Sequence, residues 1–393
     1  MILQTSVEDV LRRVWRPEAL VAPIHWQDLP TPALVLERTA LQNNIKHMAD
    51  FLGPLSKGFR PHAKTHKSAQ LAHLQIEAGA VGICVAKISE ALTMAAAGIP
   101  AILVTSPLTT AAKVEVALYI CRQFNTQLDL VVDSHAGLEL ILNQSAANEQ
   151  MPGIVLDLDV AMGRTGIRDD GLLNELVERV IASDCLSLKG FQHYAGHLMH
   201  IEDFAERAEK SANLWQKVEA RVRSVTERFQ LSLDELIITG CGTGTYNIDC
   251  HQALITDLQV GSYVFMDEEY RLIHGEDSDR FEDFDSALTV ACTTISSPTG
   301  KTITVDGGYK AFASDSVAPV SDELAGVKFH FAGDEHGVLV RPPGEQTLEL
   351  GQVHRFVVPH CDPTVNLHDY YWVVDEDGYV RERWPVNARG CSW

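Results

Sequence analysis

The order of apolar and polar positions divides the chain into two parts. Through the first two thirds, short β-branched apolar runs alternate with segments in which apolar residues recur at helical spacing. Eight strands are predicted there, from runs that begin at Ala33, Gly58, Val81, Ala101, Leu128, Gly153, Leu188 and Glu235. Helical spacing is clearest over residues 41–52, 68–78, 88–97, 172–181 and 204–229.

Repeated strand–helix units predict a parallel sheet, and eight such units close naturally into a (β/α)8 barrel. An open, doubly wound sheet is the alternative that the periodicity leaves. From about Asp283 onward, short strands follow one another without long helices, beginning at Leu288, Thr302, Val327, Val338, Val353 and Tyr370. We therefore expect an α/β chain with an N-terminal extension (1–30) that packs on the β domain, a TIM-like barrel (31–272) and a C-terminal β-rich domain (273–393).

Composition narrows the class of protein. Hydrophobic residues make up 46% of the 393 residues, which is enough for two cores. The formal net charge of −21 would repel a phosphate backbone, so we expect no nucleic-acid partner. No apolar run reaches the roughly 18 residues of a membrane span, and residues 1–14 lack the layout of a signal peptide. The eight cysteines are scattered without a CxxC pair, as is typical of reduced thiols in the cytoplasm.

A basic octet follows the run that begins at Gly58. It reads Arg-Pro-His-Ala-Lys-Thr-His-Lys over residues 60–67. The carboxyl end of a barrel strand faces the active site, and partial burial there frees an amine for Schiff-base formation. Lys64 is therefore the candidate nucleophile, and the alternative is a solvated basic loop without a function.

Two later strand ends carry further candidates. Arg164 stands between two glycines after the run at Gly153, where its guanidinium could bind a phenolate or carboxylate oxygen. Alternatively, Arg164 pairs with Asp157 or Asp159. The next strand runs into Gln-His-Tyr-Ala-Gly-His-Leu-Met-His over residues 192–200. Three histidines and a tyrosine at a barrel mouth favour acid–base chemistry or stacking on a flat ring, although a lone histidine is usually structural.

A glycine-rich segment follows the strand predicted at Glu235. It reads Thr-Gly-Cys-Gly-Thr-Gly-Thr-Tyr over residues 239–246, and it lacks the G-x-G-x-x-G spacing of a dinucleotide site. Backbone N–H groups in such a nest, with nearby hydroxyls, suit a phosphate monoester. A flexible glycine turn is the alternative. Gly261-Ser-Tyr263 follows and could add hydroxyl contacts.

A possible metal pair lies far along the chain, in the β-rich part. His360 and Asp362 have the i, i+2 spacing that places side chains on one face of an extended chain, with Cys361 turned away. Imidazole nitrogen and carboxylate oxygen suit Mn²⁺, Mg²⁺, Co²⁺ or Zn²⁺. Two ligands alone also fit an ordinary polar turn.

Together these segments resemble one known family. The run Thr31-Pro-Ala-Leu-Val-Leu, the octet with Lys64, Gly163-Arg-Thr-Gly, residues 192–196, the glycine nest, Gly261-Ser-Tyr and His360-Cys-Asp-Pro occur in this order. They resemble the D-threonine aldolase / D-serine dehydratase family, a relative of alanine racemase among barrel-type pyridoxal-phosphate (PLP) enzymes. The resemblance covers roughly residues 28–390, and it implies an alanine-racemase-type barrel.

The resemblance implies roles for the matched residues in binding PLP. Lys64 would bind the cofactor covalently, Arg164 would approach the phenolic oxygen, and Tyr194 would pack near the ring. The phosphate would be held by Gly242, Thr243, Gly244 and Tyr263.

The resemblance also implies a metal site and a base. His360 and Asp362 would bind the divalent metal. Asp362 supplies a hard oxygen, which favours Mn²⁺ or Mg²⁺ over Co²⁺ or Zn²⁺. His200 falls six residues after Tyr194, where the aldolase members place their candidate base. Dehydratase members typically have His-x-Cys at the metal, so Asp362 favours the aldolase branch.

The implied reaction is that of a lyase. A metal-bound D-β-hydroxy-α-amino acid of the D-threonine type would lose its hydroxyl proton to His200 and split into glycine and an aldehyde, with PLP as electron sink. The alternatives are 3-hydroxy-D-aspartate aldolase, D-serine or 3-hydroxyaspartate dehydratase and, outside these classes, a non-catalytic PLP carrier or an amino-acid racemase. The resemblance further implies a homodimer in which the partner subunit helps to build the site, and the scattered cysteines place it in the cytoplasm.

Overall fold

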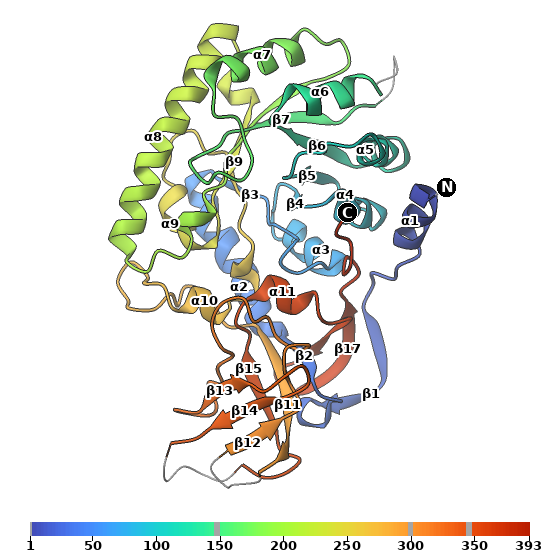
Figure 1. The fold of residues 1–393 in the computed structure, drawn as a ribbon, viewed down its shortest axis with the longest axis vertical. Coiled ribbons are helices and arrows are strands. Elements are labelled where there is room, and N and C mark those ends of the chain that lie inside the picture. The colour runs from blue at the N-terminus through green and yellow to red at the C-terminus, as the bar shows by residue number, and fades with distance from the viewer. Residues whose placement is uncertain (1, 145–149, 298–301, 343–347) are drawn as a thin grey trace.

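The computed structural model describes residues 2–144, 150–297, 302–342 and 348–393 (Figure 1). An eight-stranded parallel sheet forms in the order β3-β10-β9-β8-β7-β6-β5-β4. A parallel bridge between His62 and Cys84 joins the ends of this sheet, so that it closes as a barrel. The strands of the barrel are β3 (Gly58–Phe59), β4 (Ile83–Val85), β5 (Ala101–Val104), β6 (Gln127–Val132), β7 (Gly153–Asp157), β8 (Leu188–Gln192), β9 (Ile237–Gly240) and β10 (Asp257–Leu258).

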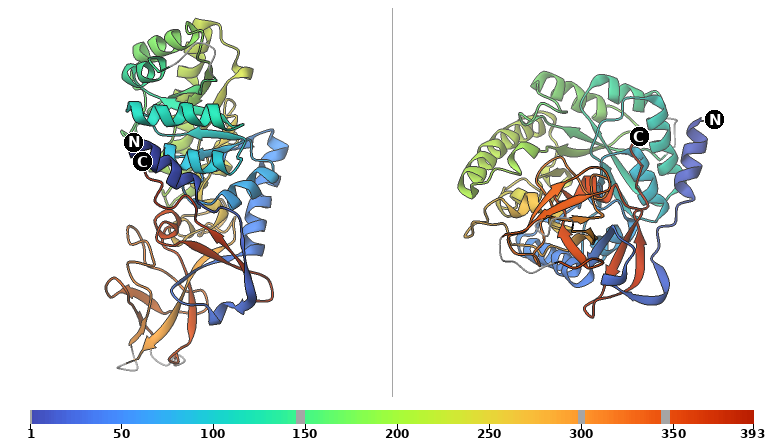
Figure 2. Two further views of the ribbon diagram at one scale, coloured as in Figure 1. Left: turned by 90° about the vertical axis from the view of Figure 1, so that its right-hand side faces the viewer. Right: turned by 60° about the horizontal axis from the view of Figure 1, so that its bottom comes forward.

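Helices surround the barrel, as the second view of Figure 2 shows. The longest is α8 (Phe204–Phe229), which buries a stripe at spacings of three and four residues and begins at Asp203, whose side chain caps the Glu206 N–H. The other helices and helical turns of this part are α2 (Arg38–Leu52), η2 (Gly53–Leu55), α3 (Ala69–Glu77), α4 (Ile88–Ala96), α5 (Ala111–Gln123), α6 (His135–Leu142), α7 (Asp170–Ile181), η3 (Gly196–Leu198), η4 (Leu233–Glu235), η5 (Thr243–Thr245), α9 (Tyr246–Asp249), η6 (Ser262–Val264) and α10 (Glu268–Arg271).

A second sheet, mixed in direction, lies below the barrel in Figure 1. Its order is β1-β17-β16-β2-β11-β12-β14-β13, and β15 pairs with β11. Its elements are β1 (Glu18–His25), η1 (Trp26–Asp28), β2 (Ala33–Glu37), β11 (Leu288–Ser296), β12 (Thr302–Val305), β13 (Lys328–Phe331), β14 (Gly337–Val340), β15 (Val353–Val357), α11 (Cys361–Val365), β16 (Tyr370–Val374) and β17 (Tyr379–Pro385). The β-rich C-terminal part that the sequence predicts is therefore confirmed.

One predicted barrel strand belongs to the other sheet. The run at Ala33 forms β2, which pairs antiparallel with β11 and parallel with β16. The eighth barrel strand is instead β10, a two-residue strand too short to produce a periodic signal. Because β2 is buried on both faces, its apolar run resembles a barrel strand although it joins the mixed sheet. The glycine-rich segment accordingly follows the seventh strand of the barrel, not the eighth.

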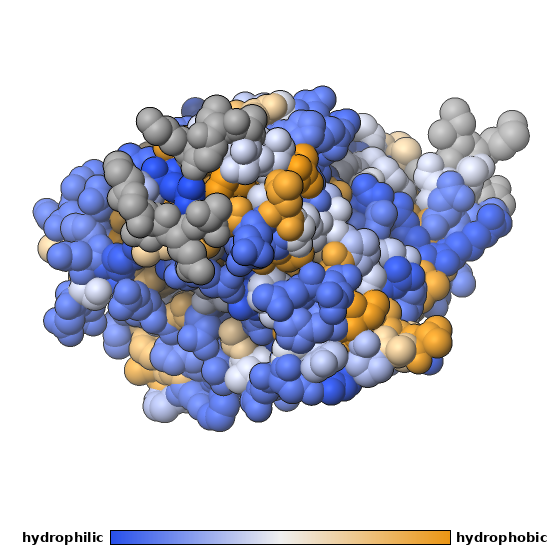
Figure 3. Space-filling view, turned by 90° about the horizontal axis from the view of Figure 1, so that it is seen from below, coloured by the Kyte–Doolittle hydropathy of each residue, from blue (hydrophilic) through white to orange (hydrophobic). Residues whose placement is uncertain are grey.

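The N-terminal segment joins both parts of the molecule. Strand β1 pairs with β17 in the mixed sheet, whereas α1 (Ile2–Leu11) packs on the barrel helix α4. The C-terminus lies beside the same helix, because the N–H of Ser89 donates to the carbonyl of Trp393. Hydrophilic residues cover most of the far end of the mixed sheet, with scattered apolar patches (Figure 3). Among the described residues, no helix combines the length and apolar character needed to cross a membrane.

Candidate active site

A cavity of about 240 Å³ opens at the carboxyl ends of the barrel strands. Residues that end or follow seven of the eight strands contribute to its wall, and α10 adds Tyr270. The functional face of a (β/α)8 barrel is this end. Among the residues singled out from the sequence, the wall contains Lys64, Arg164, Tyr194, Gly242 and Thr243.

Lys64 lies in the turn that follows β3, and its amine donates a hydrogen bond to Asp362. The two side chains are 42% and 16% exposed, so the pair lies at the cavity and is not sealed in the core. Burial alone lowers the pKa of the Lys64 amine, but the Asp362 carboxylate outweighs it and the pKa is raised. Burial would raise the Asp362 pKa, yet Lys64 and His360 lower it to about 2. Tertiary folding thus brings a barrel lysine and a carboxylate from the C-terminal part into one charged pair.

His62 is a neighbour of Lys64 that the sequence did not single out. Its Nε2 lies 3.1 Å from the hydroxyl of Thr105, which follows β5. Burial and the Lys64 ammonium hold the pKa of His62 well below its ordinary value, so the imidazole is neutral at pH 7. The only signal in the sequence was its place in the octet, where four other basic side chains were equally plausible candidates.

Arg164 and Tyr194 meet across the cavity from the loops after β7 and β8. The guanidinium carbon lies 5.2 Å from the centre of the Tyr194 ring, a cation–π distance. Asp159 pairs with Arg168 at 2.5 Å. Asp157 accepts hydrogen bonds from Thr165 at 2.7 Å and from Gln192 at 3.1 Å. The guanidinium fork of Arg164 therefore stands at the cavity wall, available to an oxygen ligand.

The glycine-rich segment packs so closely against its neighbours that side chains at Gly242 and Gly244 would not fit. A Cβ at Gly242 would meet Met199 Sδ at 2.5 Å, and a Cβ at Gly244 would meet the Met199 carbonyl oxygen at 2.2 Å. A Cβ at Gly261 would meet Thr65 Oγ1 at 2.7 Å. Close approach of three backbone segments at the cavity therefore requires these glycines.

Tyr263 is not placed as expected. Its side chain is fully buried, and its hydroxyl accepts a hydrogen bond from Gln75 at 3.1 Å in the core. The backbone N–H of Tyr263 donates to Thr243 Oγ1 at 3.1 Å, while Ser262 lines the cavity. Within Gly261-Ser-Tyr263, the hydroxyl at the cavity is therefore that of Ser262, because η6 turns the tyrosine inward.

The histidines of residues 192–200 divide into different environments. His193 is 2% exposed, packs edge-on against Trp215 at 4.2 Å between ring centres, and has a pKa lowered to about 3 by burial. His200 is 38% exposed, and its ring centre lies 4.6 Å from that of Tyr270. Burial lowers the pKa of His200 as well. His193 is thus a structural histidine, whereas His200 lies beside a residue of the cavity wall.

His360 and Asp362 stand at the start of α11. The backbone of His360 is extended, but Asp362 already belongs to the first helical turn, so the expected extended geometry is wrong. His360 Nδ1 lies 2.8 Å from Asp315 Oδ2, and Asp362 Oδ2 is buried without a hydrogen-bond partner. Cys361 between them is fully buried. In the described part of the chain, no three His, Cys, Asp or Glu side chains gather in a geometry that could hold a metal ion.

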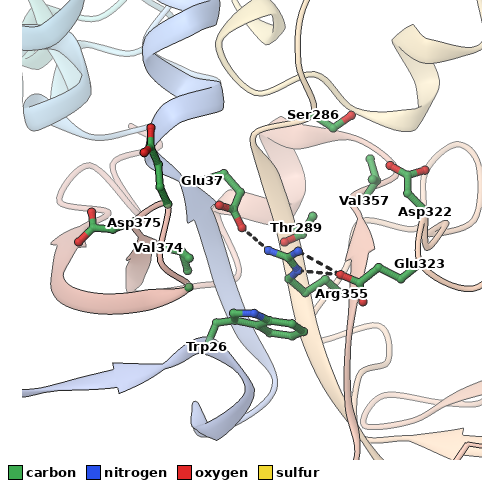
Figure 4. Close-up of a pocket in the computed structure, with 12 residues that line it drawn as sticks. Trp26, Glu37, Ser286, Thr289, Asp322, Glu323, Arg355, Val357, Val374 and Asp375 are labelled. Carbon is green, nitrogen blue, oxygen red and sulfur yellow. Dashed lines mark hydrogen bonds and ion pairs between the residues drawn. The ribbon is translucent and has the colours of Figure 1, made fainter.

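A second, wider cleft of about 400 Å³ lies on the mixed sheet (Figure 4). Arg355 stands at its centre and donates to Glu37 and Glu323. Its guanidinium carbon also lies 4.4 Å from the centre of the Trp26 ring. The one arginine of this cleft is therefore committed to two carboxylates and an indole.

Comparison with known proteins agrees with this geometry. Residues 36–269 match the family described as alanine racemase, N-terminal domain, and residues 287–374 match a putative serine dehydratase domain. A D-threonine aldolase of Arthrobacter sp. is 32% identical over 92% of this chain and 93% of its own. A 3-hydroxy-D-aspartate aldolase of Paracoccus denitrificans (strain Pd 1222) is 32% identical over 93% of this chain and 94% of its own.

A solved structure extends the likeness to three dimensions. The D-threonine aldolase of Filomicrobium marinum has a TM-score of 0.89 and 31% identity, over 96% of this chain and all of the other. Its likeness spans the barrel and the mixed sheet together. The chain therefore belongs to the D-threonine aldolase / D-serine dehydratase family of PLP-dependent enzymes with an alanine-racemase-type barrel.

Proposed function

We propose that this protein is a lyase that cleaves D-β-hydroxy-α-amino acids into glycine and an aldehyde. The observation that carries the proposal is the hydrogen bond from Lys64, which lines the barrel cavity, to Asp362 of the C-terminal part. This contact places an amine that can bind a carbonyl cofactor beside a carboxylate of the candidate metal pair. The aldolases named above lend support, because their likeness spans both parts of this chain.

The cavity fits PLP in its chemistry. Lys64 would hold the cofactor through its amine, Arg164 would approach the phenolic oxygen, and Tyr194 would pack near the ring. Gly242, Thr243 and Ser262 line the cavity and, with the adjacent Gly244, would hold the phosphate through backbone N–H groups and hydroxyls. When bound, PLP supplies an electron sink for the electron pair left at Cα.

His360 and Asp362 would supply only two ligands to a divalent cation, so this site is less complete than the one for PLP. The unpartnered buried oxygen of Asp362 is the kind of atom that a cation or a water would satisfy. The carboxylate of Asp362 favours Mn²⁺ or Mg²⁺, while the imidazole of His360 also accepts softer ions such as Zn²⁺. A metal would polarise a substrate hydroxyl and lower its pKa. Asp362 would then exchange its contact with Lys64 for one with the metal.

His200 is the proposed base. Its lowered pKa keeps the imidazole neutral at pH 7, which is the form that accepts a proton. It would take the proton of the substrate β-hydroxyl while Arg164 and the glycine segment hold the rest of the site in place. His62, neutral and beside Lys64, cannot add a second positive charge there.

Dehydration is the second candidate function, because residues 287–374 match a putative serine dehydratase domain. Aspartate at 362, where dehydratase members typically have cysteine, favours cleavage. The β-substituent is a methyl group in D-threonine and a carboxylate in 3-hydroxy-D-aspartate, and the same chemistry serves both.

A substrate panel tests the proposal. The enzyme loaded with PLP and Mn²⁺ is incubated with D-threonine, 3-hydroxy-D-aspartate, D-serine and L-threonine, and glycine, aldehyde, ammonia and 2-oxo acid are measured separately. Glycine and aldehyde in equal amounts from a D-substrate, lost on chelation, are expected. Ammonia and 2-oxo acid without glycine would replace cleavage by dehydration, and equal turnover of L-threonine would refute D-specificity.

We also infer a cytoplasmic homodimer. All eight cysteines are free, which agrees with a reducing compartment. Sedimentation of the active enzyme at twice its mass of 43.3 kDa is expected, and a fully active monomer would contradict the dimer.

A further inference from the structure

The short helix α10 joins the barrel to the segment that carries His360 and Asp362 (Figure 1). The first N–H groups of a helix have no partner within it. In α10 the N–H of Glu268 donates to the carbonyl of Val358 at 3.0 Å, and that of Glu269 donates to Pro359 at 3.2 Å. The chain immediately before His360 is thereby docked on the start of α10.

Asp267 adds a side-chain link to the same junction. It is fully buried, and its Oδ1 accepts the N–H of Tyr270 at 3.1 Å as the N-cap of α10. Its Oδ2 accepts the N–H of Cys361 at 2.8 Å, at the start of α11. One carboxylate therefore serves the first turns of two helices, and Cys361 is the residue between His360 and Asp362.

The other side of α10 faces His200. The Tyr270 ring lies 4.6 Å from the imidazole of His200, centre to centre. Glu269 places one carboxylate oxygen 3.9 Å from His200 Nε2 and the other 3.9 Å from His360 Nδ1. Residues 267–270 thus contact the candidate base on one side and the candidate metal pair on the other.

We propose that Asp267 is a positioning residue, which fixes the distance between His200 and the pair His360–Asp362 by tying α10 to the start of α11. The proposal rests on the proposed function, in which base and metal act on one substrate hydroxyl. Misplacement by about 1 Å can cost on the order of 100-fold in rate, so the link matters for turnover even though Asp267 itself touches no substrate.

Asp267→Ser tests the hydrogen bond to Cys361 apart from the hydrogen bond to Tyr270. Serine is a good N-cap and keeps the bond to Tyr270, but it is too short to reach Cys361. We expect faster hydrogen exchange in the peptide that contains Cys361, weaker Mn²⁺ binding by about 10-fold in calorimetry with the metal alone, and kcat lower by about 10-fold with little change in KM. Excess Mn²⁺ should restore part of kcat, and PLP absorbance should be unchanged.

Asp306→Asn is the matched control. Asp306 also bridges two segments, through the N–H of Thr293 at 2.7 Å and the hydroxyl of Thr31 at 2.5 Å, but it lies in the mixed sheet. This variant should lose thermal stability without a change in Mn²⁺ affinity or kcat. Asp267→Thr, which also caps a helix but is too short to reach Cys361, is the second variant if serine prevents folding.

Wild-type hydrogen exchange at Cys361 in the folded Asp267 variants would overturn the proposal. Equal losses of kcat in the Asp267 and Asp306 variants would also overturn it, because they would show a general effect on stability. If the wild-type enzyme binds no Mn²⁺, the metal part of the proposed function fails, and hydrogen exchange still decides the role of Asp267.

Discussion

Two hollows of this molecule each contain a cation held by carboxylates, and they differ in what remains unpaired. In the cleft of the mixed sheet, Arg355 contacts Glu37, Glu323 and the Trp26 ring. In the barrel cavity, Lys64 has Asp362 alone, whose second oxygen is buried without a partner. In the larger cleft the charged groups pair with one another, whereas the smaller cavity has polar groups that could still bind a ligand.

The comparison shows that volume alone does not single out the candidate active site. The cleft, at about 400 Å³, exceeds the cavity, at about 240 Å³. Three N–H groups of Arg355 already donate to carboxylates, so this cation contributes to stability and has fewer donors left for a ligand. An amine, a guanidinium and an unpartnered carboxylate oxygen beside a glycine segment are instead the groups that converge in a ligand site.

The strongest test of the comparison replaces each of the two cations by the other basic residue, so that the charge is kept. Lys64→Arg keeps the positive charge beside Asp362 but removes the amine that can bind a carbonyl group, so we expect activity to fall by roughly 10³-fold or more, with loss of the visible absorbance of bound PLP. Arg355→Lys should keep full activity. Activity of Lys64→Arg close to wild type would refute the role of Lys64.

A smaller effect is expected at His200. Burial lowers its pKa below 6.5, as do the charges of His360 and Arg207, while Asp267 raises it. Glu269 also faces it at 3.9 Å. The neutral form therefore prevails at pH 7, and kcat/KM should fall with acidification only below about pH 6.5. His200→Asn should lower kcat by roughly 10²-fold and remove this acid limb. An unchanged pH profile in the variant would assign the base elsewhere.

The smallest effect on activity is expected in the cleft. Arg355→Met leaves the carboxylates of Glu37 and Glu323 without their cation. Because Glu37 is 29% exposed, the free energy of unfolding should fall by only about 1–2 kcal/mol. The rate should remain within about twofold of wild type, since the cleft holds no proposed substrate contact. Denaturant unfolding and steady-state kinetics measure the two quantities. A rate loss as large as that of His200→Asn would make the cleft part of the active site.

Local pattern accounted for much of the fold. Helical spacing over residues 204–229 corresponds to α8, and six runs after Asp283 became strands of the mixed sheet. Strand ends in a parallel barrel meet at one face, so the chemistry-bearing residues Lys64, Arg164 and Tyr194 could be expected at one cavity. Each of these inferences depends on residues near one another in the chain.

What the sequence alone determined was therefore the alternation of elements and the barrel class, and it supplied the candidates for the reactive side chains. Tertiary structure alone decided that β2 joins the mixed sheet, that Tyr263 turns inward while Ser262 faces the cavity, and that Asp267 ties α10 to α11. It also brought Asp362 to Lys64 across 298 positions of the chain. The physical reason is that periodicity reports whether a segment is buried, whereas its partners are chosen by packing and hydrogen bonding between segments far apart in sequence.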